Sequence, residues 1–229
     1  MIGIIGAMEI EIEGIRNILT EKTEKNISGI KFVSGRLGKN EVVTAVCGIG
    51  KVFASMCATS MVLEYTPDVI INTGVAGGLA EGLKIGDIVV ADKVVQHDMD
   101  TSPIGDPKGL LSGINVIYIP TDKAISDLLL QCVKAEGINA VTGIIATGDQ
   151  FIASSEKKRF IVDEFSASAA EMEGGAIGQV CYVNKMPFAI LRAMSDTADE
   201  NATVDYPTFA KDIAEKYIRV INRFAELYA

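Results

Sequence analysis

The sequence contains little histidine, no tryptophan and fewer basic than acidic side chains. Its 229 residues include a single histidine, His97, which excludes a metal site built from several histidines. With 30 acidic against 21 basic residues, the net charge is −9, and this argues against a nucleic-acid-binding protein, because such proteins present a basic surface. Any acid–base chemistry must therefore rest mainly on carboxylates.

Long apolar runs and a leader sequence are also lacking. The longest stretches without a charged residue, such as 52–63, 69–80 and 109–121, are each about a dozen residues long, shorter than the ~18–20 apolar residues of a membrane span. The first six residues carry no basic side chain and Glu9 follows soon after, which does not fit a signal peptide. The sequence thus predicts a protein that contacts neither membrane nor nucleic acid.

The cysteines show no metal-binding pattern. The four of them are scattered without any C-x-x-C spacing, at Cys47, Cys57, Cys132 and Cys181. This excludes a zinc ribbon and is typical of reduced, buried cysteines in a cytoplasmic protein. We therefore expect cytoplasmic localisation and no bound metal.

Short β-branched runs alternate with amphipathic stretches along the whole chain, without a linker or repeat. Strands are expected at 2–6, 30–36, 41–47, 68–73, 87–91, 114–119, 139–146 and 187–194. Helices are expected at 8–21, 51–64, 155–165 and 173–184, from Thr121 as N-cap to Gly137, and from Pro207 to the C-terminus. This alternation indicates a single domain over 1–229 with an α/β fold, a three-layer sandwich around a central mixed sheet.

Ligands of such sheets bind beyond the carboxyl ends of the strands, so the residues there are candidates for a site. Glu11 lies in the first helical turn after strand 2–6, where the helix dipole alone would also favour a carboxylate. Three glycines, Gly74, Gly77 and Gly78, follow the apolar strand 68–73. They allow either a tight turn or close approach of the backbone to a ligand.

Buried charge is expected in two further segments. Arg192 lies inside the apolar strand 187–194, where an arginine is costly without a partner, and Asp196 or Glu11 could provide one. Glu173, with Glu171 beside it, stands among small and apolar residues, so a buried acid is expected there. Paired carboxylates can supply a proton and activate water when a glycosidic bond is cleaved. The pattern allows such a hydrolase without identifying one.

Seven short motifs are spread along the chain. They are Gly3-Ile4-Ile5-Gly6-Ala7-Met8-Glu9-x-Glu11, Gly48-Ile49-Gly50-Lys51, Asn72-Thr73-Gly74-x-Ala76-Gly77-Gly78, Gly86-Asp87-Ile88-Val89-Val90, Gly148-Asp149-x-Phe151-Ile152, Glu171-Met172-Glu173 and Ser195-Asp196-x-Ala198-Asp199. In this order they closely resemble the 5′-methylthioadenosine/S-adenosylhomocysteine nucleosidases of the nucleoside phosphorylase superfamily. The resemblance implies a nucleoside phosphorylase-like fold, a homodimer, and hydrolysis of the N-glycosidic bond that releases adenine without metal or organic cofactor.

The resemblance also implies roles for individual residues. Glu11 would be the base that activates water, with help from Arg192, and Asp196 the acid that protonates adenine, with Ser195 positioning it. Glu173 would hold the ribose. The substrate pocket would further include the Met172 backbone at the ribose, Phe151 stacked on adenine, the Ile152 backbone at its Watson–Crick edge, Ile49, Ala76 and Gly77 in the walls, and Tyr206 near the ribose or the 5′ group.

Two features depart from the family pattern. Val75 stands where the family usually has a serine, and segment 101–112 lacks the aromatic residues that would close over the 5′-thio tail and reach the partner subunit. The preference among methylthioadenosine, S-adenosylhomocysteine and 5′-deoxyadenosine therefore stays open, and so does a futalosine-type nucleoside hydrolase.

Three other functions fit the sequence less well. A purine nucleoside phosphorylase of the same fold needs cationic or N–H partners for phosphate, yet no arginine occurs between Arg36 and Arg159. A non-catalytic nucleoside-binding module would not need the complete set of catalytic groups. A Rossmann oxidoreductase would need a glycine fingerprint that Gly3-x-x-Gly6-Ala7 does not complete.

Overall fold

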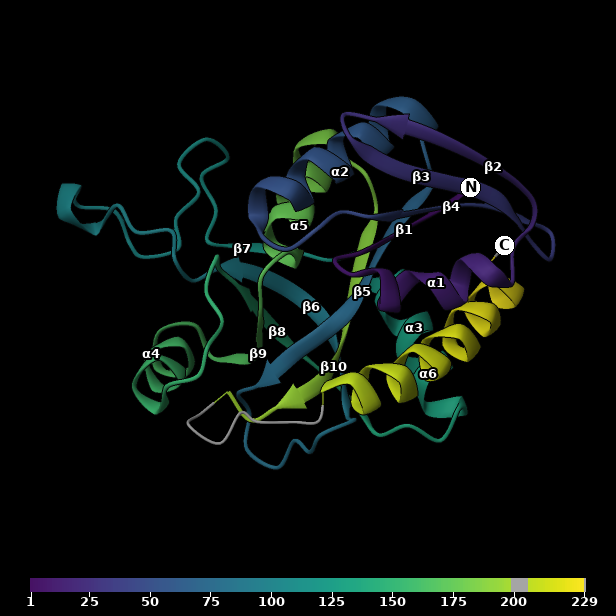
Figure 1. Cartoon of the computed structure of the whole chain (residues 1–229). Helices are drawn as coiled ribbons and strands as arrows, with labels where there is room; N and C mark the ends of the chain where they lie inside the picture. The colour runs from purple at the N-terminus through teal and green to yellow at the C-terminus, as the bar shows by residue number, and fades with distance from the viewer. Residues whose placement is uncertain (199–205, 229) are drawn as a thin grey trace.

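The computed structural model describes residues 1–198 and 206–228, with the backbone alone at 206–208, 210 and 211 (Figure 1). The strands are β1 (Ile2–Gly6), β2 (Thr20–Ile27), β3 (Ile30–Leu37), β4 (Asn40–Val46), β5 (Val69–Gly78), β6 (Ile88–Gln96), β7 (Tyr118–Pro120), β8 (Ala140–Thr147), β9 (Ala167–Glu171) and β10 (Phe188–Asp196). The helices are α1 (Glu9–Asn17), α2 (Lys51–Tyr65), the short 3-10 helix η1 (Ser102–Ile104), α3 (Lys123–Ala135), α4 (Ser155–Phe165), α5 (Gly174–Asn184) and α6 (Tyr206–Leu227).

These strands form one mixed sheet, as the sequence predicts. The order is β10-β6-β8-β9-β5-β1-β4-β3-β2, with β7 beside β6. Parallel pairs such as β1–β5 and β5–β10 occur together with antiparallel pairs such as β6–β10 and β5–β9. Because β5 pairs with both β9 and β10, strands β5, β9, β8, β6 and β10 close on themselves like a small barrel. The closed part brings the ends of β5, β9 and β10 together.

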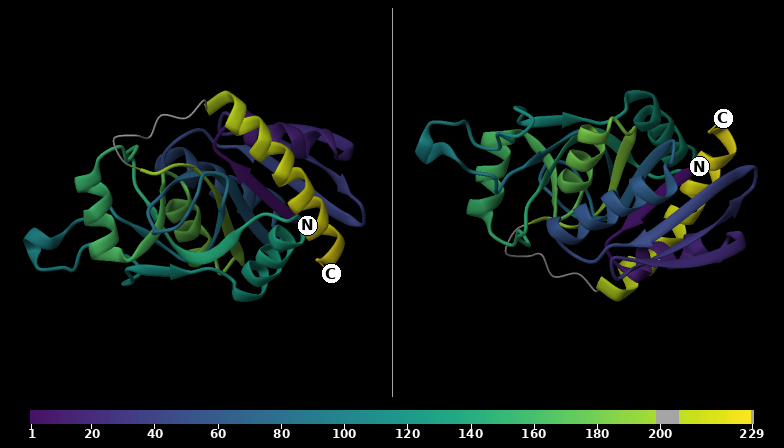
Figure 2. Two further views of the ribbon diagram at one scale, coloured as in Figure 1. Left: turned by 90° about the horizontal axis from the view of Figure 1, so that it is seen from below. Right: turned by 90° about the horizontal axis from the view of Figure 1, so that it is seen from above.

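Helices cover both faces of the sheet and complete the three predicted layers. On one face α2 and α5 lie side by side and bury Cys57 and Ile177 against the strands (Figures 1 and 2). On the other face α1, α3 and α6 bury residues such as Ile12, Leu129 and Val220. Along the described ranges, no helix is both long and apolar enough to span a membrane.

Two strands were missed because their sequences carry no strand pattern. The predicted helix 8–21 ends at Asn17, and Thr20–Ile27 forms β2, an exposed edge strand that pairs only with β3. Its threonine, glutamate and lysine side chains give no alternation of apolar and polar residues. Strand β9 consists of alanine, serine and one glutamate, which lack the β-branched side chains typical of strands.

Two further predictions were wrong in detail. The N-cap of α3 is Asp122 and not Thr121, because the Asp122 carboxylate accepts the Ile125 amide at 3.0 Å. The predicted strand 114–119 is reduced to β7 and one isolated bridge between Leu111 and Val116.

The glycine segment after residue 73 is not a separate loop but the second half of β5. Gly77 pairs with Asp196 on β10 and with Ala170 on β9. A Cβ at Gly77 would lie 2.9 Å from Asp196 Oδ1, and a Cβ at Gly74 would collide with the Arg192 guanidinium. These glycines therefore allow charged side chains to pack directly on the β5 backbone.

Candidate active site

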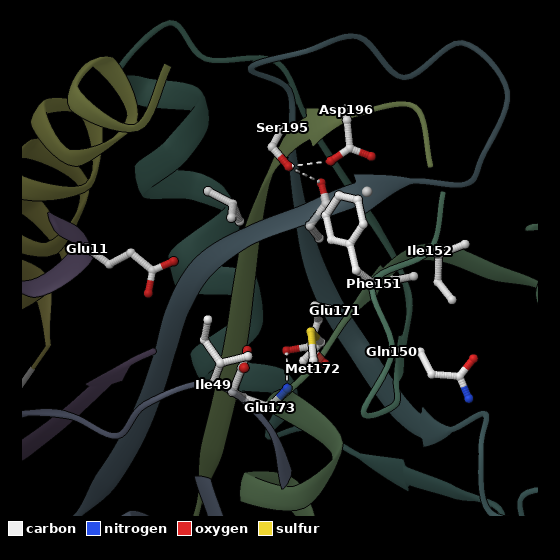
Figure 3. A pocket seen from close by; sticks show the side chains of 14 residues that line it. Glu11, Ile49, Gln150, Phe151, Ile152, Glu171, Met172, Glu173, Ser195 and Asp196 are labelled. Atoms are coloured by element: carbon white, nitrogen blue, oxygen red, sulfur yellow. Dashed lines mark hydrogen bonds between the residues drawn. The ribbon is translucent and has the colours of Figure 1, made fainter. Parts of the chain in front are cut away.

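A cavity of about 270 Å³ opens where β5, β9 and β10 end (Figure 3). Its walls are formed by Glu11, Ile49, Val75, Ala76, Gly77, Gln150, Phe151, Ile152, Ala170, Glu171, Met172, Glu173, Ser195 and Asp196. All predicted site residues are among them except Arg192 and Tyr206. Among the residues that the structure describes, the walls contain four carboxylates but no lysine, arginine or histidine. The cavity is therefore acidic and partly apolar, which suits an uncharged or cationic ligand.

Glu11 reaches the cavity from the first turn of α1. Its Oε2 accepts the backbone amides of Ala7 at 2.7 Å and Met8 at 3.0 Å, which fixes the carboxylate in one orientation. Burial raises the pKa of Glu11, although the positive charge of Arg192 and the amide hydrogen bonds act in the opposite direction. Glu11 is thus a fixed carboxylate with increased affinity for a proton, as a general base requires.

Asp196 ends β10 and lies on the other side of the cavity from Glu11 (Figure 3). Its Oδ1 accepts the Ala198 amide at 2.8 Å, and its Oδ2 lies 2.7 Å from the Ser195 hydroxyl. The Ser195 oxygen is also 3.3 Å from the Ala76 carbonyl oxygen. The Ser195 hydroxyl has one proton and donates it to the ionised Asp196 carboxylate. If it donates to the Ala76 carbonyl instead, its oxygen can accept a hydrogen bond from a protonated Asp196.

Glu173 is the N-cap residue of α5 and joins two helices at the cavity. Its Oε1 accepts the amide of Gly50, the N-cap residue of α2, at 2.9 Å. Burial and the nearby charge of Glu171 raise the pKa of Glu173 to about 7, against the opposing effect of Arg192. This carboxyl group therefore titrates near neutral pH.

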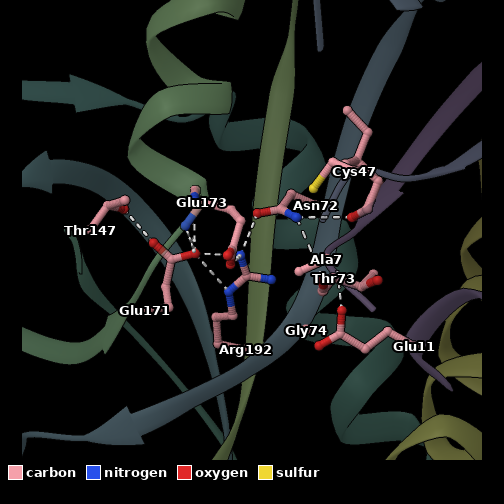
Figure 4. A network of polar contacts seen from close by, with 12 residues as sticks. Ala7, Glu11, Cys47, Asn72, Thr73, Gly74, Thr147, Glu171, Glu173 and Arg192 are labelled. Atoms are coloured by element: carbon pink, nitrogen blue, oxygen red, sulfur yellow. Dashed lines mark hydrogen bonds and ion pairs between the residues drawn. The ribbon is translucent and has the colours of Figure 1, made fainter. Parts of the chain in front are cut away.

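The partner of Arg192 is neither of the two predicted carboxylates. The guanidinium forms its ion pair with Glu171, whose Oε2 accepts Nε at 3.1 Å, and it donates from Nη2 to Asn72 at 2.6 Å (Figure 4). Arg192 is fully buried beneath the cavity and does not line it. Burial alone would lower the pKa of Arg192, but the surrounding carboxylates raise it, so the group stays charged.

Sequence reasoning missed Glu171 as this partner. The signal was present, because Glu171 and Glu173 are two acids in a segment of otherwise small and apolar residues. The register of β9 could not be predicted, and this register is what places Glu171 under the cavity beside β10.

The loop before α4 covers one side of the cavity. Ile152 is buried, whereas the Phe151 ring is 67% exposed and lies at the cavity mouth. The Asp149 carboxylate accepts the Lys51 amide at the start of α2 at 2.8 Å, and the Asp149 amide donates to Asp98 at 2.9 Å. The loop is thus fastened next to the helix that carries Gly50 at its N-cap.

Two predicted residues cannot be placed fully. Tyr206 is the first residue of α6, and its side chain lies outside the described part of the structure. Asp199, the last residue of the seventh motif, is also outside the described ranges. Within residues 1–198 and 206–228, no cluster of three or more histidine, cysteine, aspartate or glutamate side chains could hold a metal ion.

Comparison with known proteins identifies the family. Residues 1–227 match the profile of the Phosphorylase superfamily. The 5′-methylthioadenosine/S-adenosylhomocysteine nucleosidase of Shewanella loihica is 40% identical over 210 residues, 91% of each chain. A mutant of the Helicobacter pylori nucleosidase, solved with 5′-methylthioadenosine in its active site, superposes with a TM-score of 0.93 at 35% identity, over 98% of this chain and 97% of the other. A futalosine hydrolase mutant from Helicobacter pylori gives the same TM-score and identity over 98% of both chains. The chain therefore belongs to the phosphorylase superfamily and, within it, to the 5′-methylthioadenosine/S-adenosylhomocysteine nucleosidases.

Proposed function

We propose that this protein hydrolyses the N-glycosidic bond of 5′-methylthioadenosine and S-adenosylhomocysteine, and also that of 5′-deoxyadenosine, to release adenine. The observation that carries the proposal is the arrangement of Glu11, Glu173 and Asp196 around one cavity. Glu11 lies on one side of the cavity and Asp196 on the other, and Glu173 lies below both in the view of Figure 3. A nucleoside bound between them has its sugar near Glu173 and its base near Asp196.

Glu11 acts as the base in the water-adding half of the reaction. Since its Oε2 accepts two backbone amides, its other oxygen is the one that takes a proton from a water molecule. The water oxygen forms a bond to the anomeric carbon while the bond from that carbon to the adenine nitrogen breaks. The electron pair of the broken bond moves into the adenine ring. Arg192 supports this role from below, because its positive charge favours the ionised form of Glu11.

Asp196 supplies the proton that the leaving adenine takes up on its ring nitrogen 7. For this the carboxyl group must be protonated when substrate binds, and the Ser195 hydroxyl can accept that proton in a hydrogen bond. Protonation makes adenine a neutral leaving group, so the bond breaks without building up a negative charge on the base.

Glu173 holds the ribose hydroxyls and favours the positively charged, oxocarbenium-like sugar of the transition state. The remaining wall residues bind the substrate without chemistry. Phe151 stacks on adenine, the Ile152 backbone reads its Watson–Crick edge, the Met172 backbone contacts the ribose, Ile49, Ala76 and Gly77 line the pocket, and Tyr206 lies near the ribose or the 5′ group.

Phosphorolysis is the less suitable chemistry for this cavity. Phosphate needs cationic or N–H partners, but the wall side chains that carry charge are carboxylates. A futalosine-type hydrolase is the second candidate, favoured by the similarity to the Helicobacter pylori enzyme of that name. The two activities share hydrolysis of an N-glycosidic bond and differ at the 5′ end of the substrate, where segment 101–112 departs from the family pattern.

We also infer a homodimer of single-domain subunits (1–229) that works in the cytoplasm, in methionine salvage. The support for a dimer is an apolar surface on the first turns of α2, where Val52, Phe53 and Met56 are 70%, 54% and 40% exposed. Ile49, a cavity residue, is exposed beside them. A second copy of the chain would cover this surface. Size-exclusion chromatography with light scattering measures the subunit number; a monomer at micromolar concentration would contradict this inference.

Adenine release tests the main proposal. The assay compares 5′-methylthioadenosine with and without phosphate, beside S-adenosylhomocysteine, adenosine and a futalosine derivative. Release that needs no phosphate and is fastest with the 5′-thio nucleosides is the expected result. Strict dependence on phosphate would make the protein a phosphorylase, and turnover of the futalosine derivative alone would keep the mechanism and change the substrate.

A further inference from the structure

Three carboxylates in the cavity wall share one guanidinium that lies beneath the cavity. Arg192 forms an ion pair with Glu171, lies 3.7 Å from Glu173 Oε2, and its charge also acts on Glu11 (Figure 4). Both members of the Arg192–Glu171 pair have side chains that are only 1% exposed. This group therefore carries more negative than positive charge in a place where water cannot screen it.

Glu171 has the largest number of hydrogen bonds in this group. Its Oε2 accepts Nε of Arg192 at 3.1 Å and the amides of Glu173 at 3.1 Å and Gly174 at 2.7 Å. The same oxygen accepts Nη2 of Arg192, while Oε1 accepts the Thr147 hydroxyl. Glu171 thus connects β8, β10 and the first amides of α5, and no hydrogen-bonding capacity of Oε2 is left for a substrate.

This geometry ties Glu171 to Glu173 in two ways. The Glu171 carboxylate holds the backbone amide of Glu173, so it fixes where the Glu173 side chain starts. It also binds Arg192 at closer range, so the guanidinium forms an ion pair with Glu173 Oε2 at 3.7 Å, beyond hydrogen-bonding distance. As a result, Oε2 of Glu173 can still accept a hydrogen bond from a substrate, although it pairs with Arg192.

We propose that Glu171 is a positioning residue for the reaction, a step that rests on the proposed function: it holds Arg192 and the start of α5 so that Glu173 faces the ribose. Glu171 acts through Glu173 and does not touch the substrate. Without the negative charge of Glu171, Arg192 would close from 3.7 Å to hydrogen-bonding contact with Glu173 and withdraw it from the sugar hydroxyls.

The charge of Glu171 also affects proton binding by Glu173. Glu173 is faced by Glu171 on β9, Arg192 on β10, Glu11 on α1, the Cys47 thiol at the end of β4 and the Gly50 amide. Burial raises the pKa of the Cys47 thiol, so that group stays uncharged. Because the charge of Glu171 raises the pKa of Glu173, neutralising Glu171 lowers it.

The variant Glu171→Gln tests this by removing the charge with little change in shape. We expect kcat for 5′-methylthioadenosine to fall about 10- to 100-fold, the range expected when a buried, charge-assisted hydrogen-bond network is disrupted. The acid limb of kcat/KM, near pH 7 in the wild type because of Glu173, should move to lower pH. The matched control Thr147→Val keeps all charges and removes the hydroxyl that donates to Glu171 and accepts the Gly175 amide. Because no charge changes, its acid limb should not move.

Two outcomes would overturn the proposal. One is a Glu171→Gln variant with wild-type kcat. The other is a lower kcat with an unmoved acid limb, which would assign Glu171 a purely structural part. If Glu171→Gln does not fold, Glu171→Asp keeps the charge but shortens the side chain by one carbon; kcat should fall while the acid limb stays, and wild-type kcat would contradict the positioning role.

A second readout does not depend on activity. The folded-state pKa of Glu173 is about 7, above its ordinary value of 4.5, so its contribution to the free energy of unfolding is present at low pH and lost as pH rises through 7. The free energy of unfolding should therefore decrease with pH up to about pH 7. Glu173→Gln should remove this decrease, and in Glu171→Gln the decrease should end at a lower pH. If the wild type released no adenine but the slope behaved in this way, the proposed function would fail while the coupling of the two glutamates would stand. An unchanged slope in Glu171→Gln would refute the coupling.

Discussion

Replacing Glu11 by glutamine removes the proposed base while keeping the size of the side chain. The two backbone amides at 2.7 and 3.0 Å require an acceptor, so the glutamine carbonyl oxygen must take the place of Oε2. Its NH₂ group then occupies the position from which Glu11 would accept the proton of water. An amide cannot take up that proton, so water activation is lost.

The size of the effect follows from this geometry. General base catalysis contributes about 10²- to 10⁴-fold, so kcat should fall by at least 100-fold. Stability should not fall, because burial raises the pKa of Glu11 and the ionised form is therefore disfavoured by folding. In a chain of this size, a loss of 1 kcal/mol would lower Tm by about 2–4 °C, so even a small destabilisation would be measurable.

The assay combines adenine release at substrate saturation, calorimetry for Tm and titration calorimetry with 5′-methylthioadenosine. The matched control is Glu9→Gln on the same helix, because the Glu9 carboxylate is exposed and pairs with Arg16 away from the cavity. Glu11→Gln with a rate within threefold of the wild type would refute the assignment of the base. A large drop in Tm would show that the lost rate reflects unfolding.

Four further outcomes can be measured. Asp196→Asn should lower kcat by about 10²- to 10⁴-fold while nucleoside binding persists, because asparagine has no acidic proton to transfer; an unchanged rate would exclude Asp196 as the acid. In the wild type, kcat/KM should decline as pH falls below 7, because Glu173 with a pKa of about 7 must be ionised to accept ribose hydrogen bonds; a flat acid limb would contradict this. Gly77→Ala should reduce kcat at least tenfold, because its Cβ would lie 2.9 Å from Asp196 Oδ1 and displace that carboxyl group; a wild-type rate would show that the cavity wall yields. Tyr217→Phe removes the buried hydrogen bond of 2.6 Å to the Gly74 carbonyl, which should cost about 1–3 kcal/mol in urea unfolding; a change below 0.5 kcal/mol, the roughly expected effect of a neutral surface change, would contradict it.

Those site residues could be predicted from the sequence that belong to a recognisable motif and also lie near the end of a predicted strand. Glu11, Glu173 and Asp196 were expected at one sheet edge, and all three line the cavity. The partner of Arg192 could not be predicted, because it depends on the register of β9 against β8 and on the closure of the sheet. Neither the strand register nor the closure of the sheet can be recognised from a local sequence pattern.

For the fold as well, elements with a local sequence pattern were predicted, and elements that depend on pairing with distant strands were not. The amphipathic stripe of α6 and the stop of α3 at Gly137, with φ of +72°, are local features, and both were predicted. Strand β2 exists only because β3 offers an edge, and its exposed side chains give no sign of this. The glycines after residue 73 left a tight turn and close approach to a ligand both open. They continue β5, where their lack of a side chain allows close packing.

The place of β5 between β1 and β10 has a consequence for how activity arises during synthesis. β1 leads directly into the helix that carries Glu11, and β10 ends in Asp196, so strands from opposite ends of the chain must pair with the same central strand. Such long-range pairing gives a high contact order, and a high contact order slows folding. A nascent chain cannot form the pair of catalytic groups until β10 has left the ribosome. Activity should therefore appear only with the nearly complete chain, in one step, and no N-terminal fragment should show a fraction of it.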